Sequence, residues 1–344
     1  MRVLHVISEM GAGGAESLVA GMALAGGDVG WESAVASGGG FRADALRDAG
    51  LPVFDVPVAR RSLTGVLRAA WATRSAVRRF QPDVVLAHNV SASLTARIAA
   101  PRRPLVTVFH GVADADVAGA VRVLSRVSSV VVTVASAAAS RLHDAGLESV
   151  VVIPNAVFPT APSVDRASVR AALGVRPDVP VALCPARLEP QKRHDVLLDA
   201  WALVPGDAEL WLAGDGSLRG ALEARGVDRV RFLGTRTDVR DLLEAADVTV
   251  LTSDWEGMPI ALLESLAAGR PVVASDVDGV REVLSGGGGV LVPRRSPEQT
   301  ARALRSLLYS PVARSVAASH CGSADSHALM KSYDELLRTV LEGR

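Results

Sequence analysis

The segment that decides the fold runs from Leu251 to Leu284 and reads LTSDWEGMPIALLESLAAGRPVVASDVDGVREVL. It follows Asp247–Leu251, an apolar run typical of a buried strand. Pro259 suits the first turn of a helix, because the N–H group that proline lacks needs no partner there. Ile260–Ala267 then carries apolar residues at helical spacing, and a Gly-Arg-Pro stop leads into a second apolar strand. The segment therefore predicts a strand, a turn, a helix and a further strand.

The start of this helix is a predicted anion site. Backbone N–H groups without a helical partner are available there from Gly257, Met258 and Ile260. Glu256 adds a carboxylate in the preceding loop, and Glu264 follows eight residues later on the helix itself. The two acids bracket the helix start and can hold the two ends of a ligand whose phosphates bind between them. A solvated helix face is the plain alternative for two Glu at this spacing, but the flanking elements favour the site.

Composition narrows the class of protein. A chain of 344 residues suits two domains. Hydrophobic residues make up 49% and aromatic residues only 4%, as expected of buried parallel strands rich in Val, Ala and Leu. The formal net charge is zero, which gives no reason to expect a nucleic-acid partner.

Neither cysteines nor apolar runs suggest a secreted or membrane-spanning protein. Cys184 and Cys321 cannot form a disulfide framework, and neither has a partner at metal-ligand spacing. No apolar run reaches the roughly 18 residues that span a bilayer. The first residues indicate a strand rather than a signal peptide, so we expect a cytoplasmic protein.

The segment from Glu256 to Asp276 resembles the signature of the family-4 retaining glycosyltransferases, in which two Glu stand in an E-x7-E pattern. The resemblance implies an α/β protein of the GT-B fold, with two Rossmann-like doubly wound domains facing a central cleft. It implies an acceptor-side domain over 1–158, a nucleotide-sugar domain over 159–324, and a final helix over 325–344 that packs back on the first domain. In the family the first Glu contacts the transferred sugar and the second contacts the nucleotide ribose.

The first half alternates predicted strands and helices, as a doubly wound sheet requires. Gly14 lies in a Gly-rich turn after the first strand. The family places such a turn against the donor diphosphate and the acceptor. His110 follows Leu105–Phe109 in a T-x-x-H-G context. It resembles the family histidine near the sugar and the scissile bond. His88 and Asn89, after another strand, are weaker candidates for acceptor binding.

An arginine-rich segment precedes and includes a predicted helix over Leu63–Phe80. Its apolar stripe, which includes Leu67, Ala70, Trp71, Val77 and Phe80, is predicted to pack on the sheet, with Arg68, Arg74, Arg78 and Arg79 on the solvated side. The alternative function for the whole segment, Arg60–Arg79, is peripheral contact with an anionic membrane at its inner face.

The second half carries the predicted phosphate-binding cations. The run Pro185–His194 is similar to the family pattern G-R-L-x-x-x-K-G, with Ala186 and Arg193 in place of the two glycines. The resemblance implies that Arg187 and Lys192 hold the donor β-phosphate, where negative charge builds as the nucleotide leaves. Lys192 is one of only two lysines in the chain. Arg236, in a later loop, is the weaker candidate for a place beside the base.

The sequence therefore predicts a retaining, metal-independent glycosyltransferase that moves a sugar from a nucleoside-diphosphate sugar to a hydroxyl acceptor. Arg187, Lys192, Glu256 and His110 are the predicted catalytic residues, and no cofactor or metal is expected. The alternatives are a sugar-nucleotide epimerase or pseudo-glycosyltransferase on the same fold, or a protein that only binds nucleotide sugars. Arg-, Ala- and Val-rich usage suggests a bacterial source. The sugar, the base, the acceptor, the linkage and the oligomeric state stay open.

Overall fold

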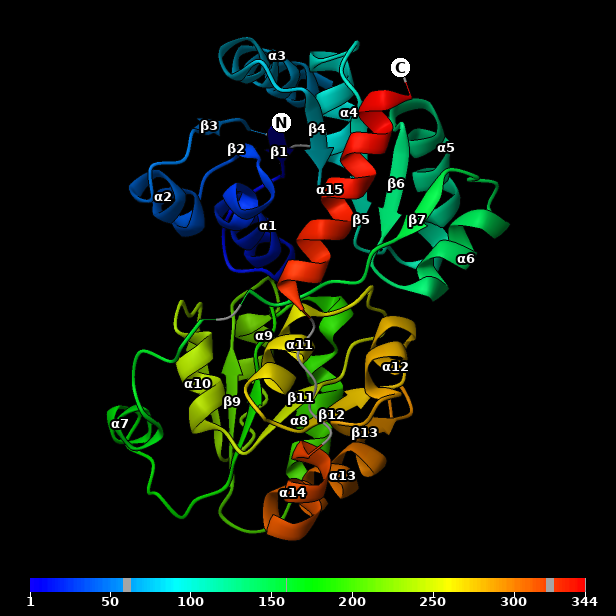
Figure 1. The fold of residues 1–344 in the computed structure, drawn as a ribbon. Coiled ribbons are helices and arrows are strands. Elements are labelled where there is room, and N and C mark those ends of the chain that lie inside the picture. The colour runs from blue at the N-terminus through cyan, green and yellow to red at the C-terminus, as the bar shows by residue number, and fades with distance from the viewer. Residues whose placement is uncertain (58–62, 159, 320–324, 344) are drawn as a thin grey trace. The chain divides into compact units, whose positions relative to one another are not determined.

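The computed structural model describes residues 1–57, 63–158, 160–319 and 325–343. The chain forms two compact units, Met1–Phe158 with Asp325–Arg344, and Pro159–Ala324 (Figure 1). Each unit has its own parallel sheet and its own hydrophobic core. Arg60, Arg61 and Cys321, which the sequence analysis singled out, lie outside the described residues.

In the part of the first unit that the structure describes, seven parallel strands form one sheet, in the order β3-β2-β1-β4-β5-β6-β7. The strand order reverses direction between β1 and β4, the point where ligands of doubly wound folds bind. The strands are β1 (Arg2–Val6), β2 (Glu32–Ser37), β3 (Val53–Asp55), β4 (Val84–Ala87), β5 (Leu105–Phe109), β6 (Val130–Thr133) and β7 (Val150–Val152).

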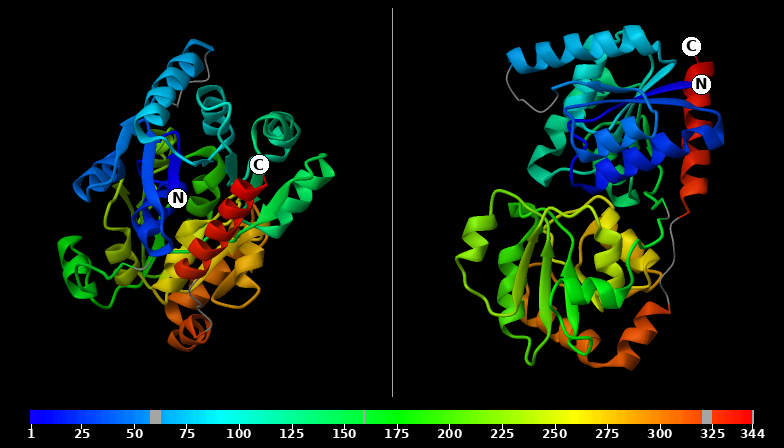
Figure 2. Two further views of the ribbon diagram at one scale, coloured as in Figure 1. Left: turned by 45° about the horizontal axis from the view of Figure 1, so that its top comes forward. Right: turned by 90° about the vertical axis from the view of Figure 1, so that its left-hand side faces the viewer.

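Helices cover both faces of this sheet (Figure 2). One apolar cluster joins the sheet to α3 and α4, and another joins the opposite face to α1 and α2. The helices of this unit are α1 (Gly14–Ala25), α2 (Phe41–Asp48), α3 (Leu63–Phe80), α4 (Val90–Ala99), α5 (Val117–Val127), α6 (Ser136–Asp144) and α15 (Ser326–Glu342), with short 3₁₀ turns η1 (Gly26–Val29) and η2 (Asp114–Asp116).

The packed face of α3 differs in part from the one predicted: Ala70, Val77 and Phe80 pack as expected, but two large residues do not. Among its described side chains the buried ones are Ala69, Ala70, Thr73, Ala76 and Phe80, which share one side of the helix. Leu67 and Trp71 were expected to pack on the sheet, but their exposed fractions are 64% and 76%. At about 100° per residue, Leu67 and Trp71 lie on the side of the helix opposite to Thr73, Ala76 and Phe80, and therefore face outward.

The second unit repeats the same topology. In its described residues six parallel strands follow the order β10-β9-β8-β11-β12-β13, which reverses between β8 and β11. The strands are β8 (Val181–Cys184), β9 (Glu209–Ala213), β10 (Val230–Gly234), β11 (Val248–Leu251), β12 (Val272–Ser275) and β13 (Gly289–Val292).

Helices α8 and α13 pack on one face of this sheet, and α7 and α10 pack on the other. A third cluster holds α11 and α12 against β11 and β12. The helices are α7 (Arg166–Ala172), α8 (His194–Ala202), α9 (Arg219–Glu223), α10 (Val239–Ala245), α11 (Ile260–Ala267), α12 (Asp278–Leu284), α13 (Pro297–Tyr309) and α14 (Pro311–Ala318), with the 3₁₀ turn η3 (Pro190–Lys192).

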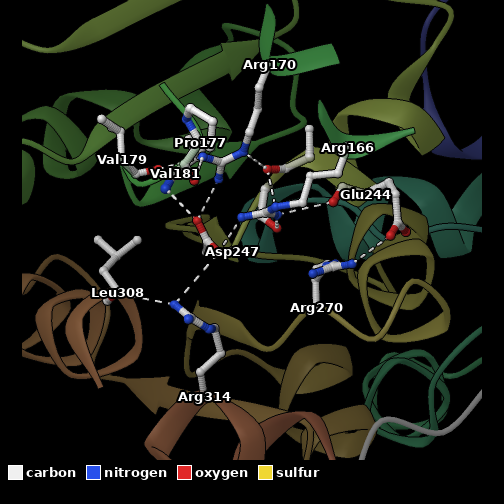
Figure 3. Close-up of polar contacts among 12 residues, drawn as sticks. Arg166, Arg170, Pro177, Val179, Val181, Glu244, Asp247, Arg270, Leu308 and Arg314 are labelled. Atoms are coloured by element: carbon white, nitrogen blue, oxygen red, sulfur yellow. Dashed lines mark hydrogen bonds and ion pairs between the residues drawn. The ribbon is translucent and has the colours of Figure 1, made fainter. Parts of the chain in front are cut away.

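A buried charge cluster stabilises the amino ends of β8 and β11 (Figure 3). Asp247 accepts a hydrogen bond from the backbone N–H of Val181 and forms ion pairs with Arg166 and Arg170 at 2.8 and 2.9 Å. Arg314 lies 3.7 Å from the same carboxylate. Arg166 and Arg170 also donate to carbonyls at the end of α10, which would otherwise lack partners. The cluster therefore joins α7, α10 and α14 to the sheet.

The last helix, α15, packs within the first unit. Asp334 accepts a hydrogen bond from the indole N–H of Trp31 at 2.8 Å, and Tyr333 and Leu337 are fully buried. Among the described residues, no helix is both long enough and apolar enough to cross a bilayer.

Candidate active site

Two of the predicted donor-binding residues of the second unit, Lys192 and Glu256, meet where its strand order reverses. Lys192 ends the turn that follows β8, and Glu256 lies in the loop that follows the neighbouring strand β11. Parallel strands bring their carboxyl ends to one edge of the sheet, so the two loops lie side by side. This edge, at the reversal, is where doubly wound sheets bind ligands.

Lys192 and Glu256 form an ion pair. Lys192 Nζ lies 2.5 Å from Glu256 Oε1, and the two side chains are 17% and 8% exposed. Ser253 donates a hydrogen bond from Oγ to the same carboxylate oxygen at 2.6 Å. A cation and an acid are thus held together at low exposure, where their electrostatic effect on a ligand is stronger than in water.

The two loops are also joined through their backbones. Asp254 N donates to the carbonyl of Gln191 at 2.9 Å, and Gln191 Nε2 donates to the carbonyl of Trp255 at 2.8 Å. Thr252 Oγ1 donates to the carbonyl of Lys192 at 3.1 Å. These bonds fix the position of the Lys192 backbone relative to the loop of Glu256.

Arg193 stands where the family pattern has its second glycine. Its φ of 51° and ψ of 45° lie in the left-handed region, which favours the glycine that the family has at this position. Asp195 and Asp254 hold its guanidinium at 2.7 and 3.2 Å. Hydrogen bonding, first to Asp195 and then to Asp254, raises the pKa of Arg193. The ion pairs offset a backbone strain of about 1–2 kcal/mol.

The turn before α11 rests on a glycine that the sequence analysis did not select. Gly279, in the first turn of α12, packs so closely on the turn that a Cβ atom there would lie 1.2 Å from the carbonyl oxygen of Gly257. Gly257 and Met258 are buried, and α11 begins at Ile260 with Pro259 as its N-cap. Glu264 lies in the second turn of α11 and is partly buried. A long-range contact therefore holds the predicted anion site in place.

Two further predicted residues follow strands β8 and β10 of the same sheet. Arg187 is exposed, and it forms no ion pair with any residue that the structure describes. Arg236, after β10, forms a two-point contact with Asp238, from Nε at 2.8 Å and Nη2 at 2.5 Å. A role for Arg236 beside a base stays a prediction.

The remaining predicted residues lie in the first unit. Gly14 is the exposed first residue of α1, after an extended N-cap. His110 follows β5 and precedes Gly111, whose φ of 99° turns the chain sharply. Asn89 caps α4 by accepting from Ala92 N at 2.7 Å, and it donates to Ser8 Oγ at 3.0 Å.

His88 is 1% exposed and faces another histidine. Its Nε2 lies 3.2 Å from Nδ1 of His5, a residue of β1 that the sequence analysis passed over. Burial lowers the pKa of His5 and of His110 to about 4. Burial, with a smaller contribution from these two neighbours, lowers the pKa of His88 well below its ordinary value. Direct contact of His88 or Asn89 with an acceptor stays a prediction.

Comparison with known families covers both units. A model described as Glycosyltransferase Family 4 matches residues 12–160, and one described as Glycosyl transferases group 1 matches residues 179–310. A lipopolysaccharide core biosynthesis glycosyltransferase of Rhizobium meliloti is 36% identical over 145 residues, or 40% of this chain and 42% of that protein. The chain belongs to the family-4 glycosyltransferases.

Other relatives agree with this membership. A GDP-mannose-dependent phosphatidylinositol dimannoside mannosyltransferase of Mycobacterium tuberculosis is 35% identical over 132 residues, 36% of this chain and 34% of that protein. The chain thus matches less than half the length of either curated relative. Anabaena HepE, solved with UDP and glucose, superposes with a TM-score of 0.86 at 24% identity, covering 98% of this chain and all of that one. This likeness and the two parallel sheets show the GT-B fold.

Proposed function

We propose that this protein transfers a sugar from a nucleoside-diphosphate sugar to a hydroxyl acceptor, with retention of configuration and without a metal. The observation that carries the proposal is the Lys192–Glu256 pair beside the start of α11, at the reversal of a Rossmann-like sheet. A diphosphate needs cations and backbone N–H donors; Lys192 is a cation at this edge of the sheet, and the start of a helix is the kind of place where backbone N–H groups bind phosphate.

Each residue has a distinct task in this proposal. Lys192 and Arg187 neutralise the charge that grows on the β-phosphate as the sugar–phosphate bond breaks. The N–H groups at the start of α11 bind the same phosphates. Glu256 orients the sugar and Glu264 binds the ribose. The leaving phosphate takes the acceptor proton on the same face of the sugar, which preserves its configuration. For the first unit, the resemblance to the family assigns His110 a place near the sugar and Gly14 a place near the donor diphosphate.

The test is a mass-spectrometric screen of UDP-, GDP-, ADP- and dTDP-sugars with and without a mixed acceptor library. A transferase forms a glycosylated product only when the acceptor is present. An epimerase converts the donor alone, and a binding protein converts nothing. Either of the last two outcomes would replace the proposal. Anomeric NMR of the product tests retention, and activity in EDTA tests independence of metal.

We propose further that α3 binds an anionic membrane surface, which would bring a lipid-linked acceptor within reach. Leu67, Trp71, Arg74 and Arg78 are spaced four, three and four residues apart and therefore share one exposed stripe. Helix α3 contains no Asp or Glu. Exposed Trp and Leu insert into the interface, while Arg side chains attract anionic headgroups at about 1 kcal/mol each.

The names of the two curated relatives, which refer to lipopolysaccharide core and to phosphatidylinositol mannosides, favour a lipid-linked saccharide as the acceptor. The proposal places the protein at the cytoplasmic face of the membrane. Sedimentation with phosphatidylglycerol-containing vesicles should capture the wild type and fail with pure phosphatidylcholine vesicles. Replacing Leu67 and Trp71 by Ala should lower binding at least tenfold, whereas Leu24→Ala, at another exposed leucine of this unit, should not. Equal binding by all variants would refute the surface.

A further inference from the structure

Three histidines from neighbouring strands lie in one row inside the first unit. His5 belongs to β1, His88 follows β4 and His110 follows β5, and these strands are adjacent in the sheet. The exposed fractions of His5 and His88 are 0% and 1%. The row crosses the place where the strand order reverses, the ligand-binding edge of such a sheet.

The three rings are nearly parallel and evenly spaced. The rings of His5 and His88 have centroids 5.4 Å apart and an interplanar angle of 17°. With a nitrogen–nitrogen distance of 3.2 Å, this pair forms a hydrogen bond edge to edge. The rings of His88 and His110 are 6.2 Å apart at 18°. The second spacing is only 0.8 Å wider than the first.

Ring nitrogens without a partner lie in each of the three residues. His5 Nε2, His88 Nδ1 and His110 Nε2 are all buried without a hydrogen-bond partner in the part of the chain that the structure describes. A buried polar atom without a partner costs about 1–3 kcal/mol. The rings of His88 and His110 are adjacent and nearly parallel. A shift of less than 1 Å would bring their centroids to the distance that separates the rings of His5 and His88.

Burial keeps all three rings neutral at physiological pH, and a neutral imidazole carries one N–H. If His5 donates from Nδ1 to His88 Nε2, the single hydrogen of His88 is on Nδ1 and points onward. The reverse direction would leave an N–H of His5 buried at Nε2 without an acceptor. In the first direction the buried N–H is that of His88 Nδ1, and the neighbouring ring of His110 carries an unpaired Nε2 that can accept it. Beyond His5 lies Trp31, whose ring N–H already goes to Asp334. Because buried N–H groups rarely stay without an acceptor, this favours the first direction.

We propose that His5 and His88 are positioning residues for His110 in the transfer reaction proposed above. His88 donates from Nδ1 to His110 Nε2 and so fixes the orientation and the tautomer of that ring. Because Nε2 is the buried nitrogen of His110, its remaining nitrogen, Nδ1, carries the hydrogen and faces the ligand. His110 thereby offers a neutral N–H donor to an oxygen of the sugar or phosphate. The partner of a ring nitrogen sets the tautomer in the same way at metal sites.

The far end of the row is held by α15. The indole of Trp31 lies 6.4 Å from the ring of His5, centroid to centroid, and Asp334 of α15 binds the indole N–H. The final helix therefore supports the end of the row that is farthest from His110.

The first arm of the test does not need activity, so it separates failure of this inference from failure of the proposed function. Nitrogen-15 NMR of histidine-labelled wild-type protein should show His110 neutral at pH 7 with its hydrogen on Nδ1. In His88→Phe, which keeps the ring but removes its nitrogens, His110 should become a mixture of tautomers. A wild-type hydrogen on Nε2 of His110, or an unchanged tautomer in His88→Phe, would overturn the inference.

The second arm is kinetic. His88→Phe should lower kcat about tenfold while the KM for the nucleotide sugar stays the same. His88→Gln, whose amide can donate a hydrogen bond, should recover part of the loss. His143→Phe makes the same change at an exposed histidine of α6 and should leave kcat unaltered. Equal kcat in wild type and His88→Phe contradicts the inference. If His88→Phe does not fold, the wild-type spectrum and His88→Gln still decide it.

Discussion

Lys192 Nζ lies 2.5 Å from Glu256 Oε1, and the pair joins two loops whose residues are 64 positions apart in the sequence. The resemblance to the family implied separate tasks for the two side chains, one at the phosphate and one at the sugar. The structure shows that each is also the electrostatic partner of the other. Removing one partner of a buried ion pair costs about 3–5 kcal/mol, whereas removing both costs far less.

Lys192→Ala should slow turnover at saturating donor by roughly one to two decades, because one charge-assisted bond to the leaving phosphate is lost. It should also destabilise the protein, since Glu256 is left unpaired. The double variant Lys192→Met, Glu256→Gln should recover thermal stability but not activity. Lys331→Ala removes the other lysine, whose side chain is 68% exposed, and serves as the control. Unchanged turnover in Lys192→Ala would remove it from the reaction.

Glu264→Ala should chiefly weaken nucleotide binding, by roughly ten- to a hundredfold, because a carboxylate that binds a ribose hydroxyl contributes about 1.5–3 kcal/mol. Isothermal titration with UDP and GDP measures this directly. Glu298→Ala, at an exposed glutamate in the first turn of α13, is the matched control. A Glu264→Ala variant with wild-type nucleotide affinity shows that Glu264 lies outside the site.

Gly279→Ala should displace the turn at Gly257, because the new Cβ would lie 1.2 Å from its carbonyl oxygen. We expect a loss of about 1–3 kcal/mol in stability and weaker nucleotide binding through the shifted N–H groups. Gly286→Ala is the control, since nothing lies within 4 Å of its added Cβ. Similar melting temperatures and affinities for the two variants would contradict the proposed contact.

Local patterns predicted much of this fold. Strand β5 and helix α3 have the predicted bounds, because a short run of β-branched and apolar residues and a helical apolar spacing are local signals. The E-G-M-P turn and the helix after it were also found where predicted. Helices α5 and α6 were not predicted.

Three features that the sequence analysis missed, at Gly279, His5 and Trp71, depend on parts of the chain that are distant in sequence or on how a helix packs. Gly279 is an ordinary glycine until α12 packs on the turn at Gly257. His5 became relevant only once β1 and β4 were known to be neighbours. The outward position of Trp71 depends on which face of α3 packs on the sheet. At Arg193 the sequence did carry a signal: the family pattern has a glycine there, and glycine is the residue that most readily adopts a left-handed backbone.

Asp247→Ala should lower the free energy of unfolding of the second unit by about 3–5 kcal/mol, because Arg170, which is 2% exposed, loses its charge partner. Chemical denaturation followed by tryptophan fluorescence measures this loss. Asp178→Ala removes an aspartate whose side chain is 73% exposed and should change stability by less than about 1 kcal/mol. Equal effects of the two substitutions would mean that the buried cluster does not stabilise the unit.

Stability should fall as pH drops from about 6.5 towards 4. In the folded protein burial lowers the pKa of His5 from 6.5 to about 4, so in this window the unfolded chain binds the proton more readily. For His5 alone the loss is about 2 kcal/mol at pH 5. Denaturation of wild type and His5→Phe between pH 7 and pH 5 measures it. The variant should show a flatter dependence, and an identical slope would contradict burial of a neutral His5.

The most direct test of the account is a crystal structure of the protein with bound UDP or GDP. The account predicts that the β-phosphate lies within about 3 Å of Lys192 Nζ and of backbone nitrogens at the start of α11, with the ribose at Glu264. A nucleotide bound away from residues 187–192 and 256–264 would contradict it.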